Sequence, residues 1–282
     1  MDHQYNIQLV KEIGFGAFST VYKAINLSNN QNVAVKVIGL EKDTSIVDVT
    51  KEVNILSKLK HPNIINIIDS MVHDRDIWLV MPLSLGSVKQ IMTHKYPEGF
   101  KDECFIATII RETLKGLEYI HKEALIHRDI KADNILISES GEIKISDFGI
   151  VGDMFKDVYK TNCKTFTGTV CWMSPEMVEQ RGHNYKTDIW SLGITTLELG
   201  YGYAPYSDYI GSIKPLLSII REEPPTYKYY GETFQYSRHF NSFVEKCLKK
   251  DSCLRVNATK MLSTKLVKKA KTSEYIRQFL HK

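Results

Sequence analysis

One stretch of the chain, residues 126–149 (IHRDIKADNILISESGEIKISDFG), restricts the possible folds more than any other. Two isoleucine-rich runs, residues 135–138 and 142–146, surround Glu139-Ser140-Gly141. Glycine and serine between two alternating runs predict a β-hairpin. The sequence therefore predicts two short paired strands with polar residues gathered at their open ends.

The polar side chains at the open end of this hairpin predict a metal site. Asn134 and Asp147 are equidistant from the Ser140-Gly141 turn, so we expect them to lie roughly opposite each other. An amide oxygen and a carboxylate in that arrangement can hold a hard cation such as Mg²⁺. Asp129, five residues before Asn134, is close enough to face the same cavity. For the Asn134–Asp147 pair alone, an ordinary solvated hairpin with acidic ends is the alternative.

The order of motifs in this stretch indicates a function far more specifically than the Asn134–Asp147 pair alone. The pattern HRD-x-K-x-x-N, then a hairpin, then DFG resembles the catalytic segment of protein kinases. The resemblance implies that Asp129 accepts or orients the proton of the acceptor hydroxyl and that Lys131 neutralises charge on the transferred group. It also implies that Asn134 and Asp147 hold Mg²⁺.

Composition limits the class of protein. The chain has 282 residues, 43% hydrophobic and 25% charged, which is typical of one large globular domain or two lobes. A net charge of +4 favours neither nucleic acid nor a membrane as a partner. The five cysteines are scattered and lack CxxC spacing, which indicates reduced thiols in an intracellular protein. The polar N-terminus MDHQYNIQ predicts no signal peptide or N-myristoylation, and no apolar run reaches membrane-spanning length. We therefore expect a cytoplasmic location.

A glycine-rich segment near the N-terminus predicts a turn that can approach phosphate. Residues 5–13 and 20–25 alternate and predict two strands, with GFGAFS (14–19) between them. Glycines let the backbone approach a polyphosphate closely, although glycines in turns are often only turn formers. A dinucleotide fingerprint would be followed by a helix, whereas here a strand follows. The segment resembles the kinase glycine-rich loop, with Ser19 in place of its third glycine.

A lysine in the third predicted strand, residues 32–38, requires a partner because buried strands rarely keep a charge. Residues 45–60 predict a helix, and Glu52 falls on its apolar face. We therefore expect an ion pair between Lys36 and Glu52, with a solvated lysine at a strand end as the alternative. The sequence VAVK (33–36) matches the kinase V-A-I-K motif, and the resemblance implies that Lys36 holds the α- and β-phosphates of ATP.

The resemblance also implies an adenine pocket. Residues 77–81 predict an apolar strand and residues 82–86 a connection between two lobes, whose backbone would meet adenine. Several of these positions are equally consistent with an ordinary core. The complete ATP-binding set that the resemblance implies is Ile13, Gly14, Phe15, Gly16, Ala17, Phe18, Ser19, Thr20, Val21, Ala34, Lys36, Met81, Pro82, Ser84 and Leu136.

The rest of the chain predicts a helical lobe. Apolar residues recur at helical spacing over residues 102–123 and 187–200, and the second stretch is apolar nearly all round, which predicts burial. Asp188 resembles the kinase aspartate that supports the backbone of the catalytic loop, with a simple helix N-terminal acid as the alternative. Arg255 resembles the arginine that pairs with Glu176 of the motif SPE. Further helices are predicted at residues 213–222, 240–249 and 259–268.

No long element is predicted between Asp147 and Glu176. Long irregular loops in compact domains are usually functional or disordered, and the resemblance identifies this span as an activation segment. A phosphate on Thr165 would add about −1.5 to −2 charges, and Arg128 is the expected acceptor. Thr167 is the alternative phosphorylation site. Thr169 is assigned to the substrate site, where it would bond the catalytic aspartate and lysine.

The match extends over almost the whole chain. GTVCWMSPE (168–176) resembles the GTPxWMAPE signature of sterile-twenty-like kinases, with Val170 and Ser174 as departures. Residues 86–88, 185–191 and 266–271 resemble its oxidative-stress-responsive/SPAK (Fray) branch. The implied fold class is α+β, the bilobal protein kinase fold. We expect a small β-rich N-lobe with one regulatory helix (1–82), a hinge (83–87) and a larger helical C-lobe (88–282) with the activation segment 147–176.

We therefore expect a serine/threonine protein kinase that uses ATP with Mg²⁺, or Mn²⁺ as the alternative metal. In the family that the chain resembles, a β-branched residue such as Ile150 after DFG goes with threonine acceptors, and Lys131 differs from the usual loop of tyrosine kinases. The expected partners are protein substrates and an upstream activating kinase. An ATP-binding pseudokinase scaffold is the alternative, disfavoured because the catalytic set is intact. A small-molecule kinase is disfavoured by the activation segment.

Overall fold

The computed structural model describes residues 6–16, 19–39, 53–54, 56–148, 152–153, 169–182, 184–209, 211–231 and 234–281. The chain divides into two compact units, residues 1–85 and residues 86–282. Some predicted site residues lie outside the described residues, namely Ala17, Phe18, Glu52, Thr165 and Thr167, and nothing is described of the side chain of Thr169.

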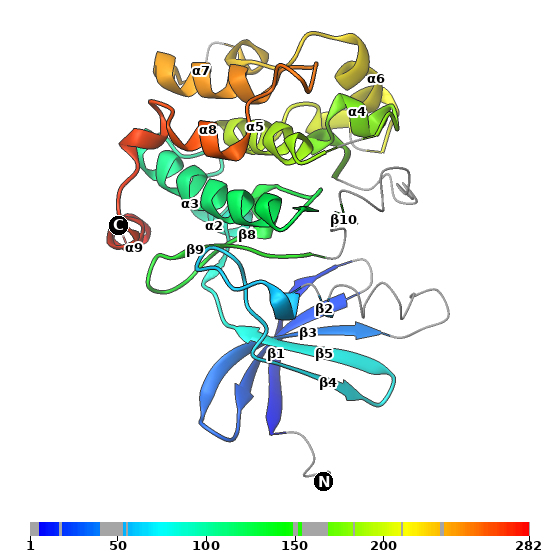
Figure 1. Cartoon of the computed structure of the whole chain (residues 1–282). Helices are drawn as coiled ribbons and strands as arrows, with labels where there is room; N and C mark the ends of the chain where they lie inside the picture. Colours follow the sequence, from blue (N-terminus) through cyan, green and yellow to red (C-terminus); the bar gives the residue numbers. More distant parts are fainter. Residues whose placement is uncertain are drawn as a thin grey trace. The chain divides into compact units, whose positions relative to one another are not determined.

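The first unit contains a five-stranded antiparallel sheet in the order β1-β2-β3-β5-β4 (Figure 1). Its strands are β1 (Ile7–Phe15), β2 (Ser19–Asn26), β3 (Gln31–Gly39), β4 (Asp69–His73) and β5 (Asp76–Pro82). Residues 53–54 and 56–58 are helical, within the predicted stretch 45–60. The central strand β3 is bonded on both sides, and its run of β-branched residues suits that position.

The two faces of this sheet have different residues. One face carries a core cluster of Ala24, Val33, Val35, Trp78 and Val80. Because neighbouring residues of a strand point to opposite faces, Ala34 and Lys36 lie on the other face. At one end of that other face, Ile38 and Leu79 pack with Val53 from the helical stretch. Lys36 therefore has the helix-bearing core on its own side of the sheet.

The second unit is mostly helical (Figure 1). Its α-helices are α2 (Val88–Lys95), α3 (Glu103–Lys122), α4 (Pro175–Val178), α5 (Lys186–Tyr201), α6 (Lys214–Arg221), α7 (Arg238–Cys247), α8 (Ala258–Leu262) and α9 (Ser273–Leu280). Short strands pair as β6 (Gly86–Ser87) with β8 (Ile135–Ile137), β8 with β9 (Ile143–Ile145), and β7 (Leu125–Ile126) with β10 (Gly152–Asp153). Five 3₁₀ turns are described: η1 (Ala132–Asn134), η2 (Thr169–Trp172), η3 (Ser207–Tyr209), η4 (Tyr227–Tyr230) and η5 (Val267–Lys269).

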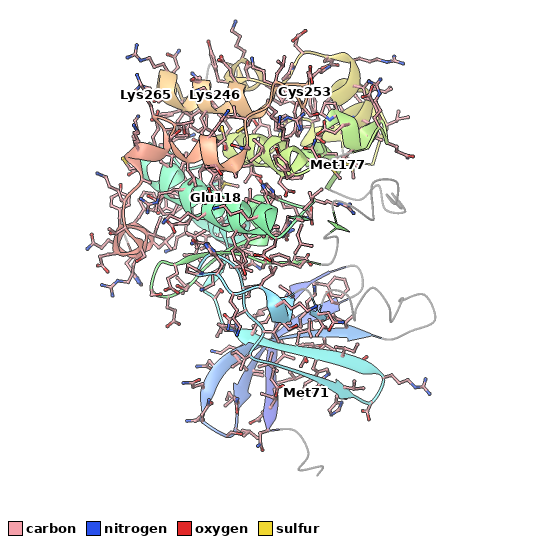
Figure 2. All side chains as sticks on the ribbon, viewed as in Figure 1. Met71, Glu118, Met177, Lys246, Cys253 and Lys265 are labelled. Carbon is pink, nitrogen blue, oxygen red and sulfur yellow. The ribbon has the colours of Figure 1, made fainter. Side chains whose placement is uncertain are left out.

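Helices α3 and α5 form the core of this unit. Both bury most of their residues; α3 contacts α5 and α8, and α5 contacts α7. Figure 2 shows side chains filling the space around these helices. Asp102 caps the start of α3 by accepting from the N–H groups of Cys104 and Phe105. Gly202 ends α5 at a φ of 90°, and a Cβ there would lie 2.0 Å from Pro97 O. Only glycine fits that position, so the end of α5 is fixed.

The expected fold class is confirmed: a five-stranded antiparallel sheet is followed by a mostly helical region. The helix predicted over 259–268 is wrong in part, because α8 ends at Leu262. There the hydroxyls of Ser263 and Thr264 donate to the carbonyls of Lys260 and Met261, which competes with further helical bonds. Strand β4 and helices α2 and α9 were not predicted. Among the described residues no helix combines the length and apolarity that crossing a membrane requires.

Candidate active site

The segment between β7 and η1 places one carboxylate at the centre of a group of polar side chains. Lys131 Nζ lies 2.8 Å from Asp129 Oδ2, and Asn134 Nδ2 donates to the same oxygen at 2.8 Å. Asn134 Nδ2 also lies 2.8 Å from Asp129 O. The other carboxylate oxygen, Asp129 Oδ1, is buried and has no hydrogen-bond partner among the described residues. A buried acceptor without a partner is costly, so this oxygen is suited to a donor from outside the chain.

Two residues of the predicted site motifs have unusual backbone conformations. Arg128 has a φ of 69° and Asp147 a φ of 61°, in the left-handed region that non-glycine residues rarely occupy. Such conformations cluster at functional sites because the surrounding structure must hold them. The two predicted site motifs, HRD and DFG, therefore each contain a strained residue.

Asp188, at the start of α5, binds the backbone of Arg128 and of the residue before it. Its Oδ2 accepts from His127 N at 3.0 Å, its Oδ1 accepts from Arg128 N at 2.8 Å, and His121 Nε2 lies 2.8 Å from Oδ2. Burial alone would raise the pKa of the Asp188 carboxyl, but the hydrogen bond and charge of His121 hold this pKa below its ordinary value. The predicted support of the loop backbone by Asp188 is confirmed.

The hairpin β8–β9 brings Asn134 close to the DFG motif, with a register one residue from the prediction. Ile135 pairs with Ile145, so Ser146, and not Asp147, is opposite Asn134. Ser146 N donates to Asn134 O at 2.9 Å. The turn is centred on Ser140, because Ser138 N donates to Glu142 O. Gly141 takes a φ of 80°, and a Cβ there would lie 2.1 Å from Ser273 O, so the position requires glycine. Asp147 follows Ser146 directly and is exposed.

These residues fit a divalent cation only if other ligands complete its shell. No cluster of three or more His, Cys, Asp or Glu suited to a metal occurs in the described part of the chain. The amide of Asn134 uses its nitrogen for the bonds to Asp129, which leaves its oxygen for a cation. The exposed carboxylate of Asp147 adds a second hard oxygen. Mg²⁺ is commonly held by one or two protein oxygens together with phosphate and water, so the donor set fits.

The first unit brings another group of predicted residues together on one sheet face. Directly opposite residues of paired strands share a face. Lys36 is opposite Val21 of β2, and Ala34 is opposite Met81 of β5. Val21, Ala34, Lys36 and Met81 therefore share the face opposite the main core cluster. Gly14 is opposite Val21 and joins the same face from β1.

The described residues of the glycine-rich segment, 14–16 and 19, lie where β1 ends and β2 begins, as the pattern predicts. Gly16 N donates to Ser19 O at 2.7 Å, and Phe15 is opposite Thr20. A Cβ on Gly16 would lie 3.1 Å from Ser19 Oγ, so the serine side chain covers the glycine. Phe15 is 86% exposed, which is unusual for a large apolar side chain. Ile13 is half-buried in β1.

The remaining predicted residues lie in both units. Pro82 ends β5 opposite Val33, and Ser84 is half-buried in the segment that follows. Leu136 belongs to β8 of the second unit, opposite Ser87. Because the predicted partner Glu52 lies outside the described residues, the Lys36–Glu52 pair stays a prediction.

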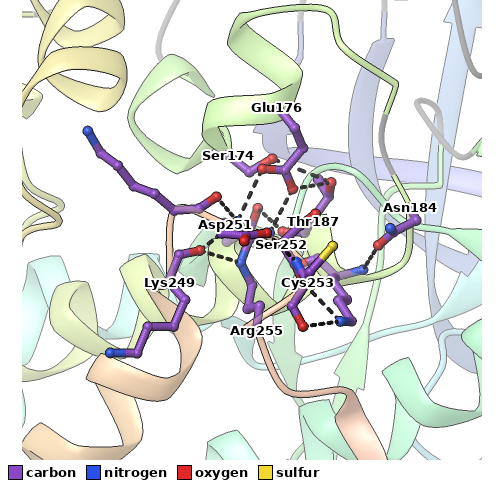
Figure 3. A network of polar contacts seen from close by, with 12 residues as sticks. Ser174, Glu176, Asn184, Thr187, Lys249, Asp251, Ser252, Cys253 and Arg255 are labelled. Atoms are coloured by element: carbon purple, nitrogen blue, oxygen red, sulfur yellow. Dashed lines mark hydrogen bonds and ion pairs between the residues drawn. The ribbon is translucent and has the colours of Figure 1, made fainter.

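A buried ion pair fixes the segment that follows the predicted activation loop (Figure 3). Arg255 Nη1 lies 2.7 Å from Glu176 Oε1 and Nη2 lies 3.1 Å from Oε2. The guanidinium also donates to the carbonyls of Lys186 and Lys249. Burial opposes ionisation of Glu176, but the Arg255 guanidinium holds the pKa of this carboxyl below its usual value. The predicted pairing of Arg255 with Glu176 is confirmed.

Sequence reasoning missed most of a polar face on α5. Asp188, Ser191, Thr195 and Glu198 recur at spacings of three and four residues and span an arc of about 80°. Ser191 Oγ donates to Trp172 O at 2.8 Å, and Thr195 Oγ1 lies 3.2 Å from Ile130 O. Glu198 Oε2 accepts from Ala132 N at 3.1 Å. Four polar residues on one face of an otherwise apolar helix were the signal that could have revealed this support.

Comparison with known proteins agrees with this geometry. Residues 7–267 match the family described as "Protein kinase domain". The chain is 42% identical over 276 residues to serine/threonine-protein kinase fray2 of Dictyostelium discoideum, which covers 97% of this chain and 26% of that protein. It is 39% identical over 288 residues to germinal center kinase 3 of Caenorhabditis elegans, with 95% and 48% covered. Serine/threonine-protein kinase fray1 of D. discoideum is 41% identical over 277 residues, with 97% and 47% covered. The chain therefore spans about half or less of the length of these relatives.

Proposed function

Because the chain belongs to the protein kinase domain family, we propose that it transfers the γ-phosphate of ATP to serine or threonine hydroxyls of proteins, with threonine preferred. The family uses ATP and a divalent metal in general. The relatives named serine/threonine-protein kinase support the acceptor class. The single observation that carries the proposal is the buried Asp129 Oδ1 beside Lys131 and Asn134, which has no hydrogen-bond partner among the described residues.

In the second unit, Asp129 Oδ1 accepts the proton of the substrate hydroxyl, or orients that hydroxyl for attack. Lys131 and Asn134 hold the other oxygen of the carboxylate, so Oδ1 keeps a fixed direction. Lys131 also neutralises charge on the group being transferred. Proton acceptance by a positioned carboxylate contributes roughly 10²- to 10⁴-fold to such a rate.

In the first unit, the face that carries Val21, Ala34, Lys36 and Met81 binds ATP. Lys36 contacts the α- and β-phosphates, paired with Glu52, while the apolar members contact the base. Gly14, Phe15, Gly16 and Ser19 of the glycine-rich segment lie where β1 ends and β2 begins, and this segment covers the phosphates. Pro82 and Ser84 meet adenine through backbone groups.

A divalent cation, Mg²⁺ or alternatively Mn²⁺, supplies neutralisation of phosphate charge when bound. Asn134 and Asp147 would hold it through their side-chain oxygens. The cysteines that the structure describes, Cys104, Cys171, Cys247 and Cys253, are free thiols, which supports a reducing, cytoplasmic location.

Phosphorylation of Thr165, with Thr167 as the alternative, regulates the activity in this proposal. The added phosphate would pair with Arg128 and order the loop, and an upstream kinase would supply it. Thr169 contributes to the substrate site. Thr165→Ala should lower the rate of substrate phosphorylation strongly, and mass spectrometry should find the phosphate on this loop. An unchanged rate with an unmodified loop would reject the switch.

The test of the catalytic proposal is incubation with radiolabelled ATP and a generic basic protein, using the full chain and Asp129→Asn. The amide keeps the shape of the carboxylate but cannot accept the proton, so phosphate transfer should fall by roughly 10²- to 10⁴-fold. ATP binding and the melting temperature should stay close to those of the unchanged protein. Asp208→Asn, an exposed carboxylate in η3, is the matched control. Retained turnover in Asp129→Asn would refute the role of Asp129, and ATP binding without any transfer by the unchanged chain would favour a scaffold.

A further inference from the structure

Glu198 is a buried carboxylate that none of the roles above uses. It is 1% exposed near the end of α5, where its neighbours in the helix are almost all apolar. Its Oε2 accepts from Ala132 N at 3.1 Å, and its Oε1 lies 3.3 Å from Lys89 Nζ. A buried carboxylate is tolerated only where partners compensate its lost hydration. The two contacts therefore account for its presence.

Ala132 lies between the two residues whose side chains bind the Asp129 carboxylate. It follows Lys131 and begins η1, which ends at Asn134. Lys131 and Asn134 are the two side chains that hold Asp129 Oδ2. A shift of the backbone at Ala132 would therefore move both supports of the carboxylate together.

The other end of the same loop is held in the same way. Asp188, ten residues before Glu198 on the same face of α5, accepts from the N–H groups of His127 and Arg128. Ten residues of helix span about 15 Å. Two carboxylates of one rigid helix thus bind backbone N–H groups before and after Asp129.

Lys89 completes this arrangement from α2. Its ammonium also donates to Gly202 O at 3.2 Å, just after α5 ends. Burial raises the pKa of the Glu198 carboxyl, while Lys89 and the N–H of Ala132 oppose that rise. Lys89 is therefore the cation beside the Glu198 carboxyl that accepts from Ala132 N.

We propose that Glu198, neutralised by Lys89, is a positioning residue that fixes Ala132 and thereby the orientation of Asp129 toward the substrate hydroxyl. This inference rests on the proposed kinase activity. Neither residue touches the reacting groups, so their loss should lower kcat while the KM values for ATP and protein stay within about twofold.

Two single substitutions and their combination test the inference. Glu198→Gln keeps one acceptor but turns an amide N–H toward the ammonium of Lys89, so the side chain must shift. Lys89→Met leaves the buried carboxylate without its cation. Each should lower kcat about 10- to 100-fold. The double variant removes the clash and lets the amide oxygen accept from Ala132, so its kcat should recover to within about threefold of the unchanged protein. Lys89→Arg, which keeps the charge, should also retain most of the activity.

Lys115→Met is the matched control, because Lys115 is half-exposed on α3 and pairs only with Glu112 on its own helix in the described structure. A lower melting temperature with unchanged kcat in both single variants would show a purely structural role and overturn the inference. So would losses that simply add in the double variant, or a raised KM for protein at constant kcat. Failure of the proposed function itself would look different: the unchanged chain would then be no more active than Asp129→Asn.

Discussion

Lys36 and Asp129 are positioned by two different means. Lys36 lies in the central strand of a sheet, where backbone hydrogen bonds to β2 and β5 and the alternation of the strand determine the face of its side chain. Asp129 lies in irregular backbone between β7 and η1, next to a residue with a φ of 69°. There the N–H groups are satisfied by side chains from α5, about sixty residues later in the chain.

The difference predicts where each site is vulnerable. A strand position survives the loss of any single neighbouring side chain, because the backbone ladder remains. A loop whose N–H groups are bound by two buried carboxylates loses its geometry when either acceptor is removed. Substitutions that touch no reacting atom should therefore damage the loop more than the sheet.

Asp188→Asn should have the largest effect. The amide replaces one acceptor oxygen with a donor that faces the N–H of His127 or Arg128. Leaving buried groups without partners in this way costs about 3–5 kcal/mol of unfolding free energy. We expect kcat per folded molecule to fall by about 100-fold, measured by steady-state kinetics beside urea unfolding. If kcat stays normal while only stability falls, the loop does not depend on α5, and the contrast with the sheet is lost.

Arg255→Met should lower the free energy of unfolding as much as Asp188→Asn does, but it should lower kcat less. The substitution leaves the largely buried carboxylate of Glu176 without its cation, although the Thr187 hydroxyl still donates to it, and this costs about 3–5 kcal/mol at pH 7. Because the folded pKa of Glu176 is lowered, the pair stabilises above the ordinary carboxyl pKa of about 4.3, and this contribution is lost as pH falls through the folded pKa.

The gap in unfolding free energy between Arg255→Met and the unchanged protein should therefore shrink at acidic pH. Urea unfolding at several pH values measures this gap. A constant gap from pH 7 to pH 3 would mean that ionisation of Glu176 contributes nothing. A loss of kcat as large as that of Asp188→Asn would place this pair among the supports of the loop.

Local patterns in the sequence predicted most of the helices and strands that are regular and buried. Residues 102–123 predicted α3 within one residue at each end, since Asp102 and Glu123 are its caps. The edge strand β4 was missed because none of its side chains is fully buried, which leaves little apolar pattern. The hairpin register was wrong by one residue, because Ser138 N donates to Glu142 O, so the loop contains residues 139–141 and is centred on Ser140.

The residues of the candidate site also fall into two groups, those that the sequence predicted and those that it did not. The residues that bear chemistry, such as Asp129 and Lys131, follow from motif order, and the resemblance implied Asp188 and the Arg255–Glu176 pair. Ser191, Thr195 and Glu198 were missed because their partners are backbone groups, which no side-chain pattern in the loop reveals. The spacing of polar residues along α5 was a signal in the sequence, but the backbone groups that these side chains bind become identifiable only once the chain is folded.

Substitutions on the two faces of the five-stranded sheet should have smaller effects, and these effects should differ between the faces. Val33→Ala removes buried methyl groups from the core face and should lower unfolding free energy by about 1–3 kcal/mol, without changing the KM for ATP. Ala34→Leu adds bulk on the Lys36 face and should raise the KM for ATP about tenfold, with little change in stability. Unfolding curves and ATP titrations separate the two. Equal effects of both variants on both measurements would mean that the faces have no distinct roles.

Thr195→Val should give the smallest effect and sharpens the contrast within α5 itself. The Thr195 hydroxyl has one proton, which lies between Ser191 O at 2.8 Å and Ile130 O at 3.2 Å. The longer contact, to Ile130 O, joins Thr195 to the loop that carries Asp129. The Ile130 carbonyl has a second lone pair that can accept from other donors, so losing this contact should cost little. We expect a loss of about 1 kcal/mol in unfolding free energy and less than about fivefold in kcat. Ser191→Ala, which removes a bond to Trp172 O instead, is the control. A kcat loss as large as that of Asp188→Asn would mean that the whole polar face, and not its two carboxylates, positions Asp129.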